Sequence, residues 1–154
     1  MIRRVLLDTN LLIAFFDTTG TTSTQEKEAV KVIMNNLLTD DNVVLIITPL
    51  IRYEALRFIQ WQQPERFEQL KTALDNLTEL DITEPVSALA TNLYRLDQHE
   101  CNANNITKNI NKRNFDIFHF CSAKQNQLEI QSRNSSDFEA LEQLYQRYQE
   151  SYQN

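Results

Sequence analysis

An aspartate, Asp8, directly follows an apolar segment near the start of the chain and is itself followed by Thr9 and Asn10. The segment 2–7 is typical of a buried strand, and no glycine follows at the turn. In an open parallel sheet, ligands bind at the carboxyl ends of the strands. Asp8 is therefore predicted to lie where such a fold does its chemistry. Thr9 and Asn10 are predicted to hold it by side-chain hydrogen bonds, although turn formation explains these two residues equally well.

Glu54 is the second carboxylate that could do chemistry. Its neighbours three, four and seven positions away on a helix are apolar, except for Arg57. Burying an ionised group without a partner is energetically prohibitive. The pattern is therefore consistent with two roles for Glu54, an ion pair with Arg57 or a position facing a metal ion.

Two further regions place polar oxygens at element ends. Asp116 lies in an apolar segment, and we expect it in the first turn of a buried helix capped by Asn114, where the helix dipole favours an anion. Asn134 and Asp137 follow the last predicted strand, so they also lie at a carboxyl end. Taken one at a time, these residues are equally consistent with ordinary helix capping and turn formation.

The elements that must position these residues alternate along the chain. Apolar runs predict strands at 2–7, 43–47, 77–80 and 128–132. Helical spacing predicts helices at 11–16, 25–38, 49–62, 64–76, 84–100, 115–124 and from 135 or 136 to about 148, with Thr48 as a cap and Pro49 as a first helical residue. Such an alternation predicts an α/β fold with a parallel sheet covered by helices on both faces.

Residues 101–114 differ from the rest because six of the fourteen are Asn and three are basic. This composition predicts an exposed polar loop with local positive charge. Contacts between cations and phosphates dominate nucleic-acid affinity. The candidates for such contacts are the basic residues near the predicted site and in this loop, with ordinary surface solvation as the alternative for each: Arg52, Arg57, Lys108, Lys112 and Arg113.

Composition narrows the classes of function. The 154 residues suit a single domain, 1–154, and the net charge of −6 argues against a broad basic surface for nucleic acid unless bound divalent cations reverse the local sign. A single glycine argues against a glycine-rich phosphate loop. Cys101 and Cys121 lack metal-site spacing, which favours reduced thiols in a cytoplasmic protein. No signal peptide or membrane span is predicted at the N-terminus.

Four motifs follow one another along the chain: Leu-Asp-Thr-Asn at 7–10, Thr-Pro-Leu-Ile-Arg-Tyr-Glu-Ala at 48–55, Asp116 at the start of an apolar helix that contains Ala123, and Ser-Arg-Asn-Ser-Ser-Asp-Phe at 132–138. Their order and spacing resemble those of the PIN-domain ribonucleases, particularly the VapC toxin subunits of bacterial toxin–antitoxin pairs. The resemblance spans almost the whole chain. It implies a PIN-like three-layer α/β/α fold with a central parallel sheet of four to five strands.

The resemblance also implies that Asp8, Glu54, Asp116 and a fourth residue converge on one or two Mg²⁺ or Mn²⁺ ions. Some family members carry the fourth acid where this chain has Asn134, and others at the position of Asp137. Hard divalent cations prefer oxygen ligands of this kind. Asp8 and Asp116 would be the central ligands, Glu54 would ligate through water or orient the nucleophile, and Asp137 would complete the site.

The implied reaction is the hydrolysis of an RNA phosphodiester bond by a metal-activated water. The implied partners are an RNA substrate, a small antitoxin protein that covers the acidic cleft, and a second copy of the chain in a homodimer. Apolar residues of the early helices would form part of the protein-binding surface or of the core: Phe15, Phe16, Val32, Met34 and Leu38.

Two other functions compete with this interpretation. A phosphohydrolase with an aspartyl nucleophile also places an aspartate after its first strand, but it needs a second acid two residues later, where this chain has Asn10. A PIN-like fold with a decayed metal site could serve as a binding module. The retention of Asp8, Glu54 and Asp116 in apolar surroundings argues against such decay.

Overall fold

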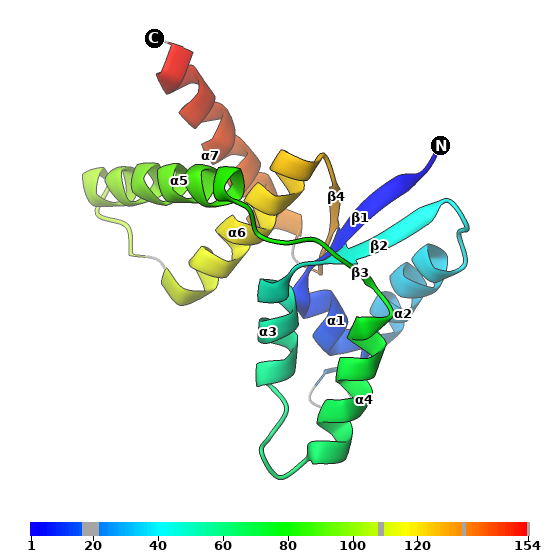
Figure 1. Cartoon of the computed structure of the whole chain (residues 1–154). Coiled ribbons are helices and arrows are strands. Elements are labelled where there is room, and N and C mark those ends of the chain that lie inside the picture. Colours follow the sequence, from blue (N-terminus) through cyan, green and yellow to red (C-terminus); the bar gives the residue numbers. More distant parts are fainter. Residues whose placement is uncertain (17–21, 108–109, 134, 154) are drawn as a thin grey trace. The chain divides into compact units, whose positions relative to one another are not determined.

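The computed structural model describes residues 1–16, 22–107, 110–133 and 135–153, with the side chains of 110–112 and 153 left out (Figure 1). The chain forms two compact units. The sheet unit comprises Met1–Asp81 and Leu128–Arg133, and the helical unit comprises Ile82–Gln127 and Asn134–Asn154. That residues 1–154 form a single domain stays a prediction.

A four-stranded sheet, parallel throughout, forms the centre of the sheet unit. The strand order is β3-β2-β1-β4, with β1 at Arg3–Leu7, β2 at Val43–Ile47, β3 at Thr78–Glu79 and β4 at Glu129–Gln131. This confirms the predicted α/β class and parallel sheet. Strand β1 lies between β2 and β4 (Figure 1). After β1 the chain continues to β2 on one side of it, and it later forms β4 on the other side. The carboxyl end of β1 is thus a switch point of the kind at which ligands bind.

Strands β1 and β2 form where the sequence is continuously apolar. Val5, Leu6 and Leu7 of β1 are buried, as are Ile46 and Ile47 of β2. A strand covered on both faces needs such an uninterrupted apolar run, since neither face meets water. The register pairs Leu6 with Ile46 on one side, and on the other it pairs Leu7 with Gln131 of β4.

The sheet unit also contains the helices α1 (Thr9–Phe15), α2 (Thr24–Leu38), α3 (Pro49–Arg57) and α4 (Pro64–Asp75). The start of α3 confirms the sequence prediction, since Thr48 Oγ1 accepts a hydrogen bond from the backbone N–H of Ile51 at 3.2 Å and Pro49 takes the first helical position. The predicted end near residue 62 is wrong, because α3 stops at Arg57. Phe58 and Trp61, which lie within the predicted range 49–62, are exposed, so a longer α3 would gain no buried face from them.

The helical unit contains α5 (Glu84–Ala103), α6 (Ile110–Asn126) and α7 (Ser135–Gln153). The predicted polar loop at 101–114 is therefore largely wrong, since α5 runs on to Ala103 and α6 begins at Ile110. Burial of Cys101 and an ion pair between Asp97 of α5 and Arg113 of α6 stabilise these extra turns. No helix of the described ranges has both the length and the apolar character that crossing a bilayer requires.

Asp116 lies beyond the first turn of α6, so its predicted place next to a cap at Asn114 is wrong. The apolar residues around Asp116 contribute to the core of the helical unit, in which Ile117 and Phe120 are buried. His119 is buried as well. Burial also raises the pKa of the Cys121 thiol to about 12, which leaves this group protonated and inert at neutral pH.

The cap at Thr48 is predicted to stabilise the protein measurably, because it satisfies a buried N–H at the start of α3. Thr48→Ala should lower the free energy of unfolding by about 1 kcal/mol in urea denaturation. Thr83→Ala is a matched control, since Thr83 occupies the same cap position of α5 without a side-chain hydrogen bond. Equal losses in the two variants would contradict the role of the Thr48 hydroxyl.

Candidate active site

The backbone of Asp8 forms hydrogen bonds with both β4 and α1. Its backbone N–H donates to the carbonyl oxygen of Gln131 at the end of β4 at 2.9 Å. Its own carbonyl oxygen accepts from the N–H groups of Leu11 and Leu12 in α1, for which Asp8 is the N-cap residue. The residue is only 4% exposed. The carboxylate therefore lies at the carboxyl end of the central part of the sheet, as predicted.

Hydrogen bonds reach both carboxylate oxygens of Asp8. The Thr9 backbone N–H donates to Oδ1 at 2.8 Å, and the Ser132 hydroxyl donates to Oδ2 at 2.7 Å. The second bond has the ordinary length of a hydrogen bond donated by a hydroxyl. Residues from two parts of the chain thus set the orientation of this side chain.

Ser132 is the site residue that the sequence prediction missed. It directly follows β4, and the pairing of Leu7 with Gln131 brings it next to Asp8. Its hydroxyl also lies 3.2 Å from the side-chain oxygen of Asn10, but its single proton can serve one acceptor at a time. The sequence showed a polar residue, Ser132, at the end of the predicted strand 128–132. It did not show the strand order that makes this residue a neighbour of Asp8.

Thr9 connects Asp8 and Glu54, the two predicted metal ligands of the sheet unit. Its backbone N–H donates to Asp8, and its hydroxyl donates to Glu54 Oε1 at 2.9 Å. The prediction that the side chains of Thr9 and Asn10 hold Asp8 is therefore wrong in detail. The Thr9 side chain holds Glu54, while the Asn10 side-chain oxygen lies against Ser132 and accepts from the backbone N–H of Arg133.

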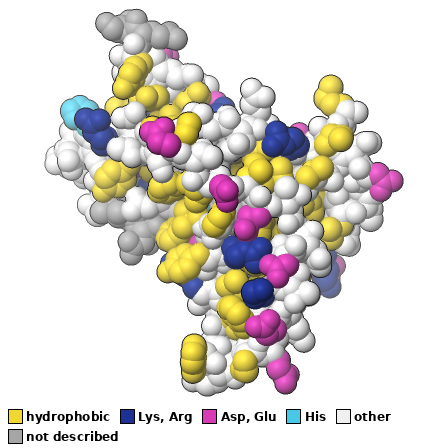
Figure 2. Space-filling model, in the orientation of Figure 1, with side chains coloured by type: hydrophobic (Ala, Val, Ile, Leu, Met, Phe, Trp, Pro, Cys, Tyr) yellow, Lys and Arg dark blue, Asp and Glu magenta, His cyan; other side chains and the backbone are white. Residues whose placement is uncertain are grey.

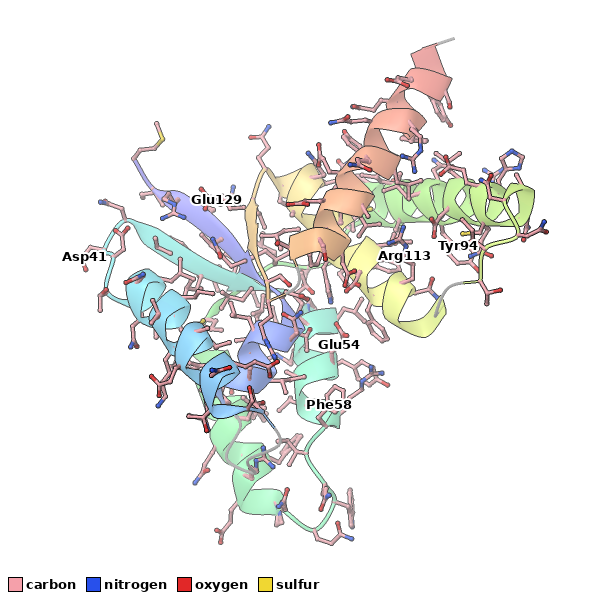
Figure 3. All side chains as sticks on the ribbon, turned by 180° about the vertical axis from the view of Figure 1, so that it is seen from behind. Asp41, Glu54, Phe58, Tyr94, Arg113 and Glu129 are labelled. Carbon is pink, nitrogen blue, oxygen red and sulfur yellow. The ribbon has the colours of Figure 1, made fainter. Side chains whose placement is uncertain are left out.

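Glu54 lies on α3, one helical turn before Phe58 (Figure 3). It is half-buried, so it occupies the margin of the core and not its interior. Ile51 and Ala55 on the same helix are buried and fasten α3 to the unit. The guanidinium of Arg57 lies over the ring of Phe58, at 5.6 Å from the centroid. Both interpretations of Glu54, as the partner of Arg57 and as a metal-facing group, stay open.

Two predicted phosphate contacts are held by carboxylates. Arg52 bonds to Asp75 and Glu79, each at 2.7 Å, and these bonds raise its pKa. In the helical unit, Arg113 makes two bonds to the buried Asp97 at 3.1 and 3.2 Å. A phosphate would have to displace these carboxylates, so a role for either arginine in substrate binding stays a prediction.

The remaining predicted site residues belong to the helical unit or lie outside the described residues. Asp116 on α6 and Asp137 in the first turn of α7 are both half-buried. Lys108, Asn134 and the side chain of Lys112 are outside the described residues. Because the four acids are divided between the two units, their convergence on one site stays a prediction.

The donor atoms of the sheet unit fit a hard divalent cation. The carboxylates of Asp8 and Glu54, with the hydroxyl of Thr9 between them, form an all-oxygen set. Mg²⁺ is commonly bound by one or two carboxylates and completed by water and substrate phosphate. Within the described residues of either unit, no three His, Cys, Asp or Glu side chains are arranged to hold a metal ion.

The bridge formed by Thr9 yields a prediction about stability. Thr9→Val keeps the shape of the side chain and the backbone bond to Asp8 but removes the hydroxyl that donates to Glu54. The free energy of unfolding should fall by about 1 to 3 kcal/mol in urea denaturation, since a partly buried hydrogen bond to a carboxylate is lost. Thr9→Ser, which keeps the hydroxyl, should recover most of the loss. Equal instability of both variants would show that the methyl group matters and the bond does not.

Comparison with known proteins supports the fold. No protein-family model matches the sequence, and no curated protein sequence matches it. The structure of VapBC2 from Rickettsia felis, bound to a DNA fragment from its promoter, contains a chain with a TM-score of 0.63 and 13% identity, covering 89% of this chain and 92% of its own length.

A second solved structure, that of Mycobacterium tuberculosis VapC20, a toxin that cleaves the sarcin–ricin loop, gives a TM-score of 0.54 at 7% identity. The match covers 86% of this chain and 93% of VapC20. At such low identities the likeness establishes the fold. The chain therefore has the α/β fold of the VapC proteins, as its motifs predicted.

Proposed function

We propose that this protein is a metal-dependent endoribonuclease that hydrolyses RNA phosphodiester bonds and serves as the toxin of a toxin–antitoxin pair. The observation that carries the proposal is the buried, doubly hydrogen-bonded carboxylate of Asp8, joined through Thr9 to Glu54 at the carboxyl end of β1. The fold shared with VapC20, a toxin that cleaves the sarcin–ricin loop, supports the same assignment.

In this proposal Asp8, Glu54, Asp116 and Asp137 hold Mg²⁺ or Mn²⁺. When bound, the ion supplies a Lewis acid for the phosphoryl oxygen and lowers the pKa of a coordinated water. The contribution of the chain itself is to hold these carboxylates in a fixed orientation before an ion binds. Ser132 sets the orientation of Asp8, and Thr9 keeps Glu54 at a fixed relation to it.

The contacts of Asn10 argue against an aspartyl-nucleophile phosphohydrolase. Such an enzyme needs a general acid two residues after its nucleophile. At this position Asn10 is an amide, and its side-chain oxygen anchors the turn after β4 by accepting from the N–H of Arg133. The position has a structural role and offers no dissociable proton.

We assign the antitoxin to a pocket of the sheet unit. The pocket has a volume of about 270 Å³ and lies between α1, α3 and α4. Its lining is mostly apolar, with one cation and one amide at the edge: Ile13, Phe16, Ala55, Phe58, Ile59, Leu70, Arg66 and Gln69. Trp61, in the connection between α3 and α4, is 95% exposed. Figure 2 shows hydrophobic side chains at the surface near this connection.

Such a pocket suits the apolar side chains of an amphipathic segment from a partner protein, with an acidic residue of that segment facing Arg66. The crystallised VapBC2 assembly is a precedent for a protein partner on this fold. A homodimer is a further proposal. Of the five residues predicted for a protein-binding surface or the core, Met34 is buried, Phe15 and Phe16 are half-buried, and Val32 and Leu38 are exposed, so Met34 belongs to the core.

Replacing Asp8 by Asn tests the metal and the reaction together. The amide preserves the size of the side chain but removes the charge that attracts a cation. An ion at ten times its Kd adds about 1.4 kcal/mol, so we expect Mg²⁺ or Mn²⁺ to raise the Tm of the wild type by about 3 to 6 °C and to leave Asp8→Asn unchanged. Cleavage of RNA in Mn²⁺, followed on gels, should be lost in the same variant.

Asp41→Asn is the matched control, because Asp41 is an exposed acid in the turn before β2, at the opposite end of the sheet (Figure 3). It should retain both the metal response and the cleavage. A wild-type melt unaffected by either ion, or full cleavage by Asp8→Asn, would contradict the proposed function.

The pocket is tested by coexpressing the protein with the product of the gene next to its own. Phe58→Asp places a charge at the edge of the pocket, and we expect the copurified complex to be lost or weakened by at least about tenfold in Kd, measured by calorimetry. Ile106→Asp is the control, since Ile106 is 51% exposed, close to the 61% of Phe58, but lies in the helical unit. Equal binding by both variants would place the partner elsewhere.

A further inference from the structure

Arg133 is a cation whose backbone is fixed beside the acids of the sheet unit. It directly follows Ser132, which donates to Asp8 Oδ2, and its own N–H donates to the side-chain oxygen of Asn10 at 3.2 Å. The sequence prediction named five basic residues as phosphate contacts and did not include this one. Its placement follows from the pairing of β4 with β1.

The side chain of Arg133 is more exposed than those of Arg52 and Arg113, two of the predicted phosphate contacts. Its Nη2 lies 2.7 Å from Oε2 of Glu26, which is in the first turn of α2. The Arg133 side chain is 28% exposed and that of Glu26 is 54% exposed. An ion pair this accessible to water contributes little to stability. By contrast, Arg113 is bound through two nitrogens to a buried carboxylate, which makes its exchange costly.

We propose that Arg133 binds a phosphate of the RNA substrate and that Glu26 competes for the same guanidinium. The inference rests on the proposed ribonuclease function. The net charge of −6 disfavours a polyanion, so a cation beside the site of Asp8 would favour the binding of a substrate phosphate. Arginine suits this role because its planar fork binds phosphate oxygens in pairs.

In this proposal Glu26 has a defined part. In the absence of RNA it keeps the guanidinium oriented, and its own position is set by Ser23, whose hydroxyl accepts from the Glu26 backbone N–H at 3.2 Å. RNA binding replaces one exposed carboxylate by a phosphate. The pair therefore acts as a substrate-positioning device that does not touch the reacting atoms.

The test measures steady-state cleavage and binding with a fluorescein-labelled RNA oligonucleotide that contains a site cut by the wild type. Arg133→Gln should raise KM about tenfold with little change in kcat, and Arg133→Lys should recover part of the loss. The plot of log affinity against log salt concentration should become shallower by about 0.7, as expected for one lost phosphate contact on a single strand. Glu26→Gln should lower KM about two- to threefold, and this gain should vanish when Arg133→Gln is added.

Arg3→Gln is the matched control. It removes the same charge and another exposed ion pair, with Glu129, but at the opposite end of β1. An Arg133→Gln variant with the KM and salt dependence of Arg3→Gln would overturn the proposal. A lower kcat with unchanged KM would do the same, since it would indicate a structural role.

RNA binding measured by fluorescence anisotropy in EDTA separates this proposal from the proposed function. Binding that depends on Arg133, in a protein that does not cleave RNA with any divalent metal, would support the phosphate contact and overturn the nuclease. Cleavage that requires Asp8 but does not change when Arg133 or Glu26 is replaced would support the nuclease and overturn the phosphate contact. Absence of both binding and cleavage would overturn both.

Discussion

The pairing of β1 with β4 is the interaction on which the rest of the site depends. It places Ser132 beside Asp8, fixes the backbone of Arg133 through Asn10, and ties the Asp8 N–H to the carbonyl oxygen of Gln131. A carboxylate with so little exposure is tolerated because each of its two oxygens accepts a hydrogen bond, one from the Thr9 N–H and one from the Ser132 hydroxyl. The same pairing makes β1 an inner strand whose two edges both pair with neighbouring strands, β2 and β4.

Ion pairs use much of the positive charge of the chain. Arg52 is bound by two acids of the sheet unit, Arg113 is bound by Asp97 in the helical unit, and Arg147 is bound through two nitrogens to Glu100. Acidic and basic side chains accordingly alternate at the surface around α4 (Figure 2). The number of basic residues in the sequence is therefore larger than the number available to bind a polyanion. The carboxylate partner of each basic residue decides how easily a phosphate can replace that partner.

Local signals in the sequence predicted the main strands, the parallel sheet and the start of α3, because apolar runs and the Thr48–Pro49 cap act over a few residues. They also placed Asp8 at a strand end. Ser132 and the bridge from Thr9 to Glu54 were missed because they depend on contacts across more than forty residues. The Asn-rich segment was misjudged as a loop, since the pairing of Arg113 with Asp97 and the burial of Cys101 outweigh the low helix propensity of asparagine. Convergence of Asp116 and Asp137 with Asp8 stays a prediction, because these acids belong to different units.

The sheet unit is discontinuous along the chain, because its fourth strand is made only after α5 and α6. Asp8 and the hydroxyl that orients it are 124 positions apart, so their contact closes one of the longest loops in the molecule. During synthesis on the ribosome, a nascent chain that has not reached β4 carries an aspartate whose second hydrogen-bond donor does not yet exist. The contact between Asp8 and Ser132 therefore forms late in folding, after almost the entire polypeptide has been translated.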